Sequence, residues 1–273
     1  MMKKIIVVLL CSFLLIMVTT SVVIINAFNN QKLNILLYGV DGRNVDEVER
    51  SDAIILINVN FNNSSVTATS IPRDSYVKIA CKNDMYDKIN HAYAFGGQKC
   101  LNDTVKHLFG LEKLKNVVLD FKTVEKLIDY FGLIELIPSY SFCQSDIELK
   151  HKYCFEKGKK VLINGSQALA YMRNRKSLPK GDLDRTRNQR QILKILIEKF
   201  MNLSLIDKIR YFNYAKRVVE TDVSIDDFNI KKIINVNNLT INEYTLKGED
   251  YKNVYYYYKL DSQYLEKIKK YYI

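Results

Sequence analysis

An arginine-rich stretch that leads into an apolar helix most tightly constrains how this chain can fold. Between residues 171 and 191 the sequence places Arg173, Arg175, Arg185, Arg187 and Arg190. Apolar residues then recur at helical spacing, so the segment after Asp184 is predicted to form an amphipathic helix that runs to about Asn202. The apolar face of this helix must pack against the protein core, and the arginines at its N-terminal end must either reach solvent or find anionic partners.

The helical spacing turns part of the arginine-rich segment towards the core. Arg185 and Gln189 are four residues apart and continue into Ile192, which places them on the inward face. Arg187 and Arg190 fall on the other side, where a solvated basic face accounts for them. An unpaired buried charge is very costly, so an inward arginine needs an anionic partner. Either a protein carboxylate or a bound phosphate satisfies this need, because the guanidinium fork matches both.

The N-terminal residues form a segment of another kind. Residues 1–4 end in two lysines, and residues 5–27 follow without a charge, a length that crosses a hydrocarbon core. The lysines favour a cytoplasmic N-terminus, so we expect a single-pass cell-membrane anchor at 5–27 with residues from about 29 onward outside the cell. A cleaved signal peptide is the alternative, but Ile25 is bulky where its cleavage site needs a small residue.

Four cysteines follow the predicted anchor, in a compartment that permits disulfides. They are Cys81, Cys100, Cys143 and Cys154. Nearness in sequence favours Cys81 with Cys100 and Cys143 with Cys154. A zinc site is the alternative, but the chain has no Cys-x-x-Cys and no histidine pair at ligand spacing.

Strand and helix patterns alternate along the rest of the chain. Strands are predicted at residues 33–38, 53–60, 66–71, 117–120, 239–246 and 254–260. Helices are predicted at residues 93–109, 121–131, from 166 to 172, from 184 to about 202, 205–219 and 262–271. This order predicts an α/β (α+β) fold in which helices sandwich a central mixed sheet. We expect one extracytoplasmic domain, with a core at 33–200 and a C-terminal part at 201–273 packed on it.

The charge of the chain indicates an anionic partner. The formal net charge is +11, from 41 basic and 30 acidic residues, and 48% of residues are hydrophobic, enough for a real core. Nucleic acid, an anionic lipid surface and a phosphorylated substrate are the candidate partners. Nucleic acid conflicts with an extracellular location, the lack of a recognisable reading helix and the lack of aromatic–basic interleaving near the arginines, so we expect none.

Two aspartates lie in the loop between the first two predicted strands. Asp41 follows the first strand and Asp52 precedes the second, so the two carboxylates are able to meet at one edge of the sheet. A pair of oxygen ligands with room for water and substrate phosphates is what magnesium uses. The alternative is a simple Asp-Gly turn and a strand-start cap.

Two further motifs follow the third strand. Arg73 and Asp74 come directly after Pro72 at the strand end, where loops often carry function, and a local ion pair is the alternative. His91 starts a helix and suits either acid–base chemistry or a structural role.

Six segments between residue 33 and about residue 200 form one recognisable set. They are Asn34-Ile-Leu-Leu-Tyr-Gly-Val-Asp41, Arg50-Ser-Asp52, Ser70-Ile-Pro-Arg-Asp74, Lys88-Ile-Asn-His-Ala-Tyr-Ala-Phe-Gly-Gly97, Asn164-Gly-Ser-Gln-Ala-Leu-Ala-Tyr-Met-Arg-Asn-Arg175 and Asp182-Leu-Asp-Arg185. In their order and spacing these segments resemble the LytR-CpsA-Psr family. Each motif alone is weak, but six in order make chance agreement improbable. The resemblance implies an extracytoplasmic phosphotransferase. Such an enzyme moves a teichoic-acid-like or capsular glycopolymer from a polyprenyl pyrophosphate lipid to a peptidoglycan sugar hydroxyl, forming a phosphodiester.

The resemblance also implies roles for individual residues. Asp41 and Asp52 would hold Mg²⁺ (or Mn²⁺). The pyrophosphate pocket would be lined by Arg50, Arg73, Arg173, Arg175, Arg185 and Gln189. Of these, Arg73, Arg173, Arg175 and Arg185 would act in catalysis, with Asp74 or Asp182 as the acceptor of the hydroxyl proton.

The chain departs from the family pattern at two places, and one alternative function stays open. Where the family usually has Arg-x-x-Arg-Gln-Gln, this chain has Asn188 and Arg190 at the fourth and last positions. Residues 131–135 replace a usual Gly-Gly-Val. The alternative function is a non-catalytic polyprenyl-phosphate-binding protein of the cell envelope. The tyrosine-rich last seventy residues are assigned no role by any of these patterns.

Overall fold

The structure is a computed structural model that describes residues 32–40, 51–83, 85–179, 181–224, 227, 239–252 and 255–273, without the side chains of Val40, Asp52 and Asp182. The predicted anchor at residues 5–27 lies outside the described residues. Within those ranges, no helix combines the length and the apolar character needed to cross a membrane.

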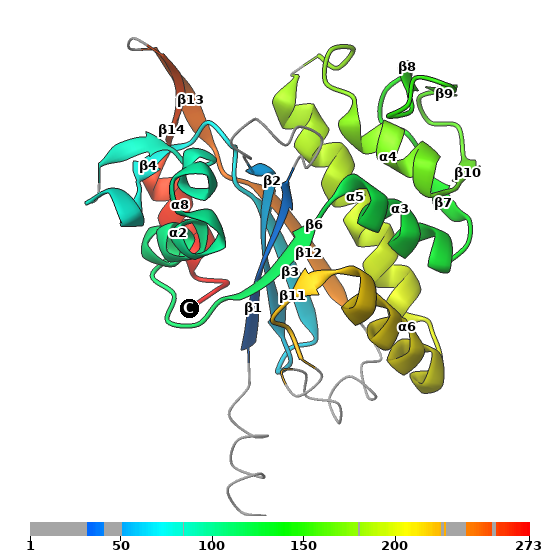
Figure 1. Cartoon of the computed structure of the whole chain (residues 1–273), viewed down its shortest axis with the longest axis horizontal. Coiled ribbons are helices and arrows are strands. Elements are labelled where there is room, and N and C mark those ends of the chain that lie inside the picture. Colours follow the sequence, from blue (N-terminus) through cyan, green and yellow to red (C-terminus); the bar gives the residue numbers. More distant parts are fainter. Residues whose placement is uncertain are drawn as a thin grey trace, which may run out of the picture.

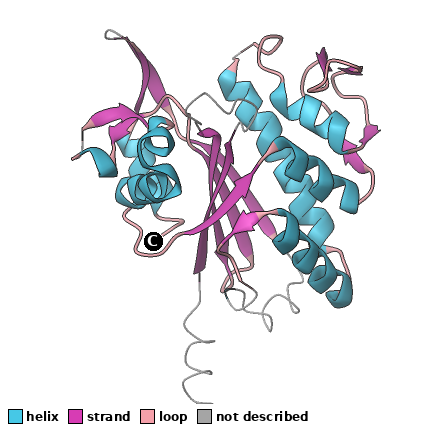
Figure 2. Ribbon diagram, in the orientation of Figure 1, coloured by secondary structure: helices cyan, strands magenta, loops and turns pink. Residues whose placement is uncertain are grey.

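A six-stranded mixed sheet forms the centre of the protein (Figures 1 and 2). In spatial order its strands are β11 (Glu220–Thr221), β6 (Lys115–Leu119), β1 (Lys32–Val40), β2 (Ser51–Asn60), β3 (Ser65–Ser70) and β12 (Thr240–Thr245). The β1–β2, β2–β3 and β6–β11 pairs are antiparallel, whereas β1–β6 and β3–β12 are parallel. The mixed central sheet predicted from the sequence is therefore confirmed.

Helices cover both faces of the sheet, which is why its strands are apolar on both sides (Figure 1). On one face, helices α2 (His91–Phe109) and α8 (Ser262–Lys269) pack over Leu36 and Ile54. On the other face, α5 (Asp182–Met201) and α6 (Leu205–Val218) pack over Ile35 and Ile57. Alternation along each strand sends successive side chains to the two cores.

A third core lies outside α5, within the helical layer. Helices α3 (Phe121–Tyr130) and α4 (Gly165–Arg173) pack there with α5 around Ile128, Tyr171 and Ile192. Two small sheets close this layer: β7 (Ile134–Leu136) with β10 (Val161–Ile163), and β8 (Phe142–Ser145) with β9 (Lys152–Phe155). Helix α5 is therefore buried against two cores, one on each side.

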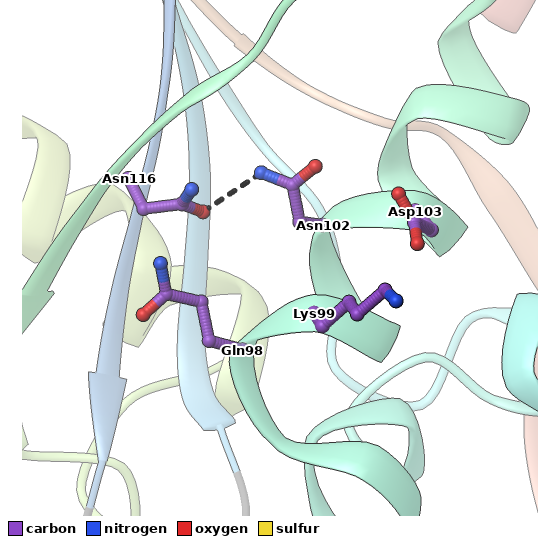
Figure 3. A pocket seen from close by; sticks show the side chains of 5 residues that line it. All are labelled: Gln98, Lys99, Asn102, Asp103 and Asn116. Atoms are coloured by element: carbon purple, nitrogen blue, oxygen red, sulfur yellow. Dashed lines mark hydrogen bonds between the residues drawn. The ribbon is translucent and has the colours of Figure 1, made fainter. Parts of the chain in front are cut away.

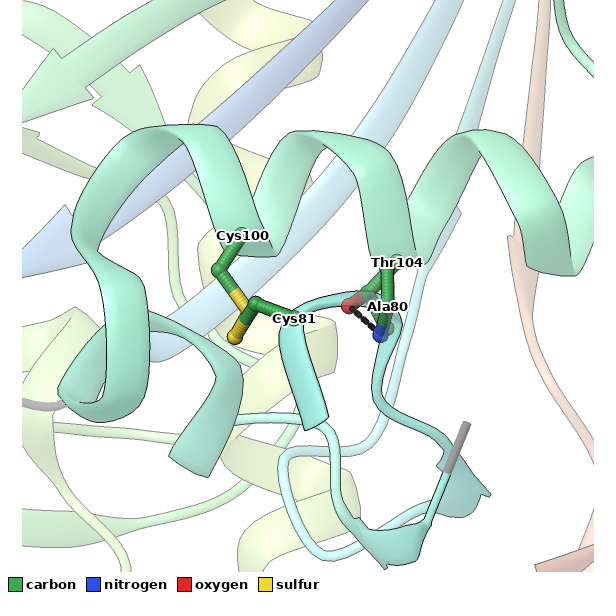
Figure 4. Close-up of a disulfide and its surroundings, with 4 residues drawn as sticks. All are labelled: Ala80, Cys81, Cys100 and Thr104. Carbon is green, nitrogen blue, oxygen red and sulfur yellow. Dashed lines mark hydrogen bonds between the residues drawn. A yellow bond between two sulfur atoms is a disulfide. The ribbon is translucent and has the colours of Figure 1, made fainter. Parts of the chain in front are cut away.

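Both predicted disulfides are confirmed, and one shapes the face covered by α2 (Figure 4). Cys143 bonds Cys154 across β8 and β9. Cys81, in the short helix η1 (Ala80–Lys82), bonds Cys100 in α2. Helix α2 kinks at Gly96 and Gly97: a Cβ on Gly96 would lie 2.8 Å from the Cys100 Cβ, and Gly97 has a φ of +61°. Glycine is favoured at both positions, at one for space and at the other for backbone conformation.

Of the four strands in two short hairpins at one end of the molecule, only β14 (Tyr256–Leu260) was predicted from the sequence, as a strand at residues 254–260. Strand β4 (Tyr76–Lys78) pairs with β5 (Tyr86–Lys88), and β13 (Gly248–Lys252) pairs with β14 (Tyr256–Leu260). The other three strands have three to five residues each and are rich in charged and tyrosine side chains, so they show too little periodicity to be recognised. A parallel bridge between Ser75 and Tyr258 joins the two hairpins.

Candidate active site

The predicted site segments converge at the end of the sheet where β1 ends, β2 begins and β3 ends. The N-terminal half of α5 connects them through two hydrogen bonds. The Asn188 Nδ2 donates to the Tyr171 carbonyl oxygen over 3.2 Å, and the Arg190 Nη1 donates to the Ser70 Oγ over 2.7 Å. Tyr171 precedes Arg173 by two residues and Ser70 precedes Arg73 by three. The α5 segment is thus tied directly to the two other segments that carry predicted site arginines.

The turn that carries Arg73 is held in place from several sides. The Ser75 Oγ donates to the Pro72 carbonyl over 2.6 Å, and the Asn90 backbone N–H donates to the Arg73 carbonyl over 3.2 Å. The Asp74 carboxylate lies 2.7 Å from the Lys88 Nζ and 3.7 Å from the Arg73 Nε. The ion pair considered from the sequence is therefore present, and it orients Arg73 as well as pairing it.

Arg173 and Arg175 leave the end of α4. The Arg173 guanidinium lies 5.3 Å from the centre of the Phe121 ring, within cation–π range. Asn174, which follows α4 in extended conformation, is buried and accepts a hydrogen bond from the Ser177 backbone N–H over 3.3 Å. This cap turns the chain so that Arg175 is exposed.

Along α5, the division into buried and exposed arginines differs from the one predicted from the sequence. Arg185 and Gln189 are half-buried, and Arg187 is exposed over the Tyr140 ring. The prediction that Arg190 belongs to a solvated face is wrong, because only 8% of the residue is exposed.

The burial of Arg190 follows from the two cores that enclose α5. Ile192 packs into one core and Leu193 packs against the other, so the solvent-facing stripe of the helix is narrow. Burial lowers the pKa of the Arg190 guanidinium, and Glu243 on β12, with its Oε2 3.8 Å from the Arg190 Nε, opposes that shift. The broad apolar run after Gln191 was the sequence signal that could have revealed this burial.

Buried polar atoms without a hydrogen-bond partner in the described part of the chain concentrate at this end of the sheet. They include the Tyr38 Oη, Ser51 Oγ, Asn90 Oδ1, Asn174 Nδ2, Asn188 Oδ1 and Gln189 Oε1. Each such atom costs about 1–3 kcal/mol when nothing satisfies it. The Tyr38 and Ser51 hydroxyls and the Asn174 Nδ2 can donate hydrogen bonds to an anion, whereas the three amide oxygens accept hydrogen bonds only from a donor such as a sugar hydroxyl.

Of the two predicted metal ligands, only the backbone of Asp52 is described. Asp41 and Arg50 lie outside the described residues, as do the side chains of Asp52 and Asp182. Strand β2 begins at Ser51, so Asp52 lies within the strand rather than before it. The β1–β2 register pairs Val40 with Ser51, the residues that neighbour Asp41 and Asp52 in the sequence. The carboxylate donors of the two aspartates fit a hard cation.

Elsewhere the described side chains offer no competing metal or acid–base centre. Among them, no group of three or more His, Cys, Asp or Glu is arranged to hold a metal ion. The His91 Nδ1 lies 2.9 Å from the Asp87 Oδ2, and its ring meets Phe95 edge-on. These contacts give His91 a structural role.

A shallow hollow lies on the α2 side of the sheet, away from the α5 arginines (Figure 3). It is lined by Gln98, Lys99, Asn102, Asp103 and Asn116. The Asn102 Nδ2 donates to the Asn116 Oδ1 over 3.0 Å, and the Asn116 backbone N–H donates to the Asp222 Oδ1. Asn102 and Asn116 are thus hydrogen-bonded within the fold, and none of the described residues that line the hollow is an arginine.

Comparison with known proteins identifies the class to which this fold and site belong. The model of the LytR_cpsA_psr family matches residues 18–272, so the chain belongs to the LytR-CpsA-Psr family. It is 34% identical over 247 residues to the Bacillus licheniformis polyisoprenyl-teichoic acid–peptidoglycan teichoic acid transferase TagU, covering 89% of this chain and 78% of that protein. The Bacillus subtilis TagU is 35% identical over 240 residues, covering 87% of this chain and 76% of that protein.

Solved structures show the same architecture. The crystal structure of B. subtilis TagV has a TM-score of 0.78 at 30% identity, covering 89% of this chain and 96% of TagV. The structure of TagT bound to LIIa-WTA has a TM-score of 0.70 at 28% identity, covering 88% of this chain and 89% of TagT. The family resemblance seen in the six sequence motifs is therefore confirmed.

Proposed function

We propose that this protein is a phosphotransferase that moves a teichoic-acid-like glycopolymer from a polyprenyl pyrophosphate carrier to a sugar hydroxyl of peptidoglycan. The observation that carries the proposal is the convergence of the arginine-bearing segments at one end of the sheet, where buried hydroxyl and amide donors also lie. The names of the TagU relatives and the TagT structure bound to LIIa-WTA support the same reaction and the same class of substrate.

The arginines are proposed to bind the pyrophosphate of the carrier. Arg50, Arg73, Arg173, Arg175 and Arg185, with Gln189, would surround its two phosphates. Guanidinium groups bind phosphate oxygens two at a time and stay charged at physiological pH. Phe121 under Arg173 and the Asp74 carboxylate beside Arg73 restrict those side chains, so less conformational entropy is lost when the substrate binds.

In the proposed reaction, the acceptor hydroxyl oxygen attacks the phosphorus that carries the glycopolymer. A new P–O bond forms as the bond from that phosphorus to the bridging oxygen breaks, and polyprenyl phosphate leaves. The hydroxyl proton passes to Asp74 or Asp182. Negative charge on the non-bridging and leaving oxygens is neutralised by the arginines, which are already in place before the reaction begins.

A divalent cation is part of the proposal. Asp41 and Asp52 would hold Mg²⁺ or Mn²⁺ at the sheet edge, next to the paired residues Val40 and Ser51. When bound, the cation would supply additional positive charge against the pyrophosphate oxygens.

We further propose that residues 5–27 anchor the protein in the cell membrane with the catalytic domain outside the cell. This location brings the site to a carrier lipid that is itself confined to the membrane, and to peptidoglycan beyond it. The 23 uncharged residues of this segment support the anchor.

The test is turnover by the full-length chain in detergent, with a lipid-linked pyrophosphate donor, Mg²⁺ and peptidoglycan fragments. We expect release of polyprenyl phosphate together with glycopolymer attached to the acceptor. The Asp52→Ala variant should lose the rate while keeping much of its lipid affinity, and Arg187→Ala, whose side chain is 51% exposed, serves as the matched control. Binding of the lipid with no turnover on any donor would replace the transferase with the non-catalytic lipid-binding alternative.

A further inference from the structure

Four tyrosine rings meet on one face of the two hairpins beside the candidate site. These rings, the tyrosine platform, belong to Tyr76, Tyr86, Tyr251 and Tyr257. Tyr76 is central: its ring centre lies 5.1 Å from that of Tyr86, 4.8 Å from that of Tyr257 and 5.8 Å from that of Tyr251. Tyr251 and Tyr257 of the tyrosine-rich C-terminal segment thus belong to an assembled surface.

The hairpin registers explain why these rings share one face. Tyr251 is directly opposite Tyr257 in the β13–β14 pair, so both side chains point the same way. In the β4–β5 pair, Tyr76 and Tyr86 lie on the face opposite Val77, which is buried in the core. Tyr86 is 51% exposed and Tyr251 is 38% exposed. Large aromatic side chains left this exposed in a contact cluster mark an interaction surface.

The charged groups on the platform face are two lysines. Lys78 and Lys88 each place an ammonium within about 6 Å of a platform ring. Asp87 is opposite Val77 in the β4–β5 register and Asp250 is adjacent to Tyr251 on β13, so both carboxylates lie on the other face of the hairpins. A sugar offers apolar C–H faces to the rings, and its hydroxyls can bind the ammonium groups and the tyrosine hydroxyls.

The platform is continuous with the candidate active site. Lys88, whose ammonium is 5.9 Å from the Tyr257 ring centre, forms the 2.7 Å ion pair with Asp74. The Tyr258 backbone N–H also donates to the Asp74 carbonyl over 2.8 Å. A ligand on the platform therefore lies next to the turn that carries Arg73.

The platform also lies at the far end of the sheet from the start of β1 (Figure 1). Lys32 begins β1, and the strand runs nine residues towards the site, a length of about 30 Å. The side of the domain that follows the proposed anchor is thus opposite the platform, which favours a partner in the wall over the membrane surface.

From these observations we propose that the tyrosine platform binds the glycan strand of the peptidoglycan acceptor. The platform rings would stack against sugar rings, and the ammonium groups of Lys78 and Lys88 would bind sugar hydroxyls. The proposal rests on the transferase function, because it assigns the acceptor to a surface beside the same site. It also gives the C-terminal tyrosines a role that the family motifs do not cover.

The test compares Tyr86→Ala/Tyr251→Ala with a matched control, Tyr130→Ala. Tyr130 is 47% exposed and stacks on Tyr214 with ring centres 4.2 Å apart, but it lies on α3 in the opposite helical layer. Full-length protein in detergent is co-sedimented with peptidoglycan sacculi stripped of teichoic acid. We expect binding of the double variant to weaken roughly tenfold, from two lost ring contacts, and that of the control to change less than about twofold. Tyr86→Phe/Tyr251→Phe, which keeps both rings, should retain most of the binding.

The outcomes separate this proposal from the proposed function. In transfer assays the double variant should raise the KM for the glycan acceptor about tenfold and leave donor-lipid affinity unchanged. If the wild-type chain shows no transfer, the transferase function fails, while sacculus binding still decides whether the platform binds glycan. Unchanged sacculus binding by the double variant would overturn the platform proposal. So would a loss confined to binding of phosphatidylglycerol vesicles, which would make the platform a membrane-binding surface.

Discussion

Two buried tyrosines in the same core show how differently the two regions of this molecule treat polar groups. Tyr272 belongs to the packed region under α2 and α8, where its Oη hydrogen-bonds the Leu56 carbonyl over 2.9 Å and the Thr69 Oγ1 over 2.6 Å. Tyr38 lies near the end of β1, at the arginine-rich end, and its buried Oη has no hydrogen-bond partner among the described residues. Burial raises the pKa of both hydroxyls, so both stay neutral.

This difference in hydrogen bonding indicates that one region serves mainly stability and the other mainly ligand binding. In the packed region a buried hydroxyl is satisfied by the fold itself, so the interaction contributes to stability. At the arginine-rich end, buried polar atoms have no partner among the described residues, an arrangement that costs stability until a ligand binds. Substitutions in the first region should therefore change folding, and substitutions in the second should change binding and rate.

The largest expected effect is on rate, at the arginine-rich end. Arg173→Ala should lower the transfer rate roughly 10³-fold, or about 4 kcal/mol, because it removes a charge that stabilises the transition state. The thermal midpoint should hardly move, and Arg187→Ala on α5 should alter neither quantity. Initial rates and thermal denaturation of both variants check this. If Arg173→Ala lost its folded structure to the same extent as its rate, the arginine-rich end would be needed for folding and not only for catalysis.

The largest expected effect on folding is in the packed region. Phe109 is fully buried and meets the Tyr272 ring edge-on at 5.3 Å. Phe109→Ala should lower the free energy of unfolding by about 3–5 kcal/mol, since it leaves a cavity in a dense core. Chemical denaturation measures the loss. The affinity of the folded fraction for donor lipid should equal that of the wild type, and a large drop in that affinity would show that the two regions are not separable.

The Cys81–Cys100 disulfide offers a second way to weaken the packed region alone. Replacing both cysteines by serine opens a loop of 19 residues and should destabilise the protein by about 3 kcal/mol. The Cys143/Cys154 double replacement, with a separation of 11 residues, is the matched control and should cost slightly less. Denaturation under oxidising conditions compares the two variants, and a shift in donor-lipid affinity in the first would contradict the assignment of this disulfide to folding.

The smallest expected effects come from removing the single hydroxyl oxygen of Tyr272 or of Tyr38. Tyr272→Phe removes a paired hydroxyl and should destabilise the protein by about 1–2 kcal/mol. Tyr38→Phe removes a hydroxyl with no partner in the described chain and should be neutral or slightly stabilising. Equilibrium unfolding of the two variants side by side is the measurement. Equal losses would mean that the Tyr38 hydroxyl is satisfied within the protein and is not held for a ligand.

Long periodic elements could be predicted from the sequence because burial on one or two faces imposes their pattern. The apolar runs of β1, β2 and β3 and the helical spacing of α2 and α5 were sufficient for the sandwich architecture, and cysteine spacing was sufficient for both disulfides. Helix α5 was harder to interpret. A single amphipathic face predicts an exposed Arg190, whereas a helix enclosed by two cores buries it against Ser70 and Glu243.

Features that depend on contacts between distant segments could not be predicted in this way. The tyrosine platform joins residues 76 and 86 to residues 251 and 257 through a single bridge at Ser75, and no local pattern reports that bridge. The convergence of the arginine segments likewise depends on side-chain hydrogen bonds from Asn188 and Arg190, the two residues that depart from the family's Arg-x-x-Arg-Gln-Gln pattern. The metal ligands Asp41 and Asp52 remain predictions.

The most direct test of the central claim is to ask which lipid the purified protein carries. Full-length chain is extracted in mild detergent, treated with organic solvent, and the extract analysed by mass spectrometry. The account predicts a bound polyprenyl phosphate or pyrophosphate that is retained in Arg187→Ala and lost in Arg73→Ala and Arg175→Ala. Equal lipid in all four proteins, or none in the wild type even after addition of lipid and Mg²⁺, would contradict a pyrophosphate site at the arginine-rich end.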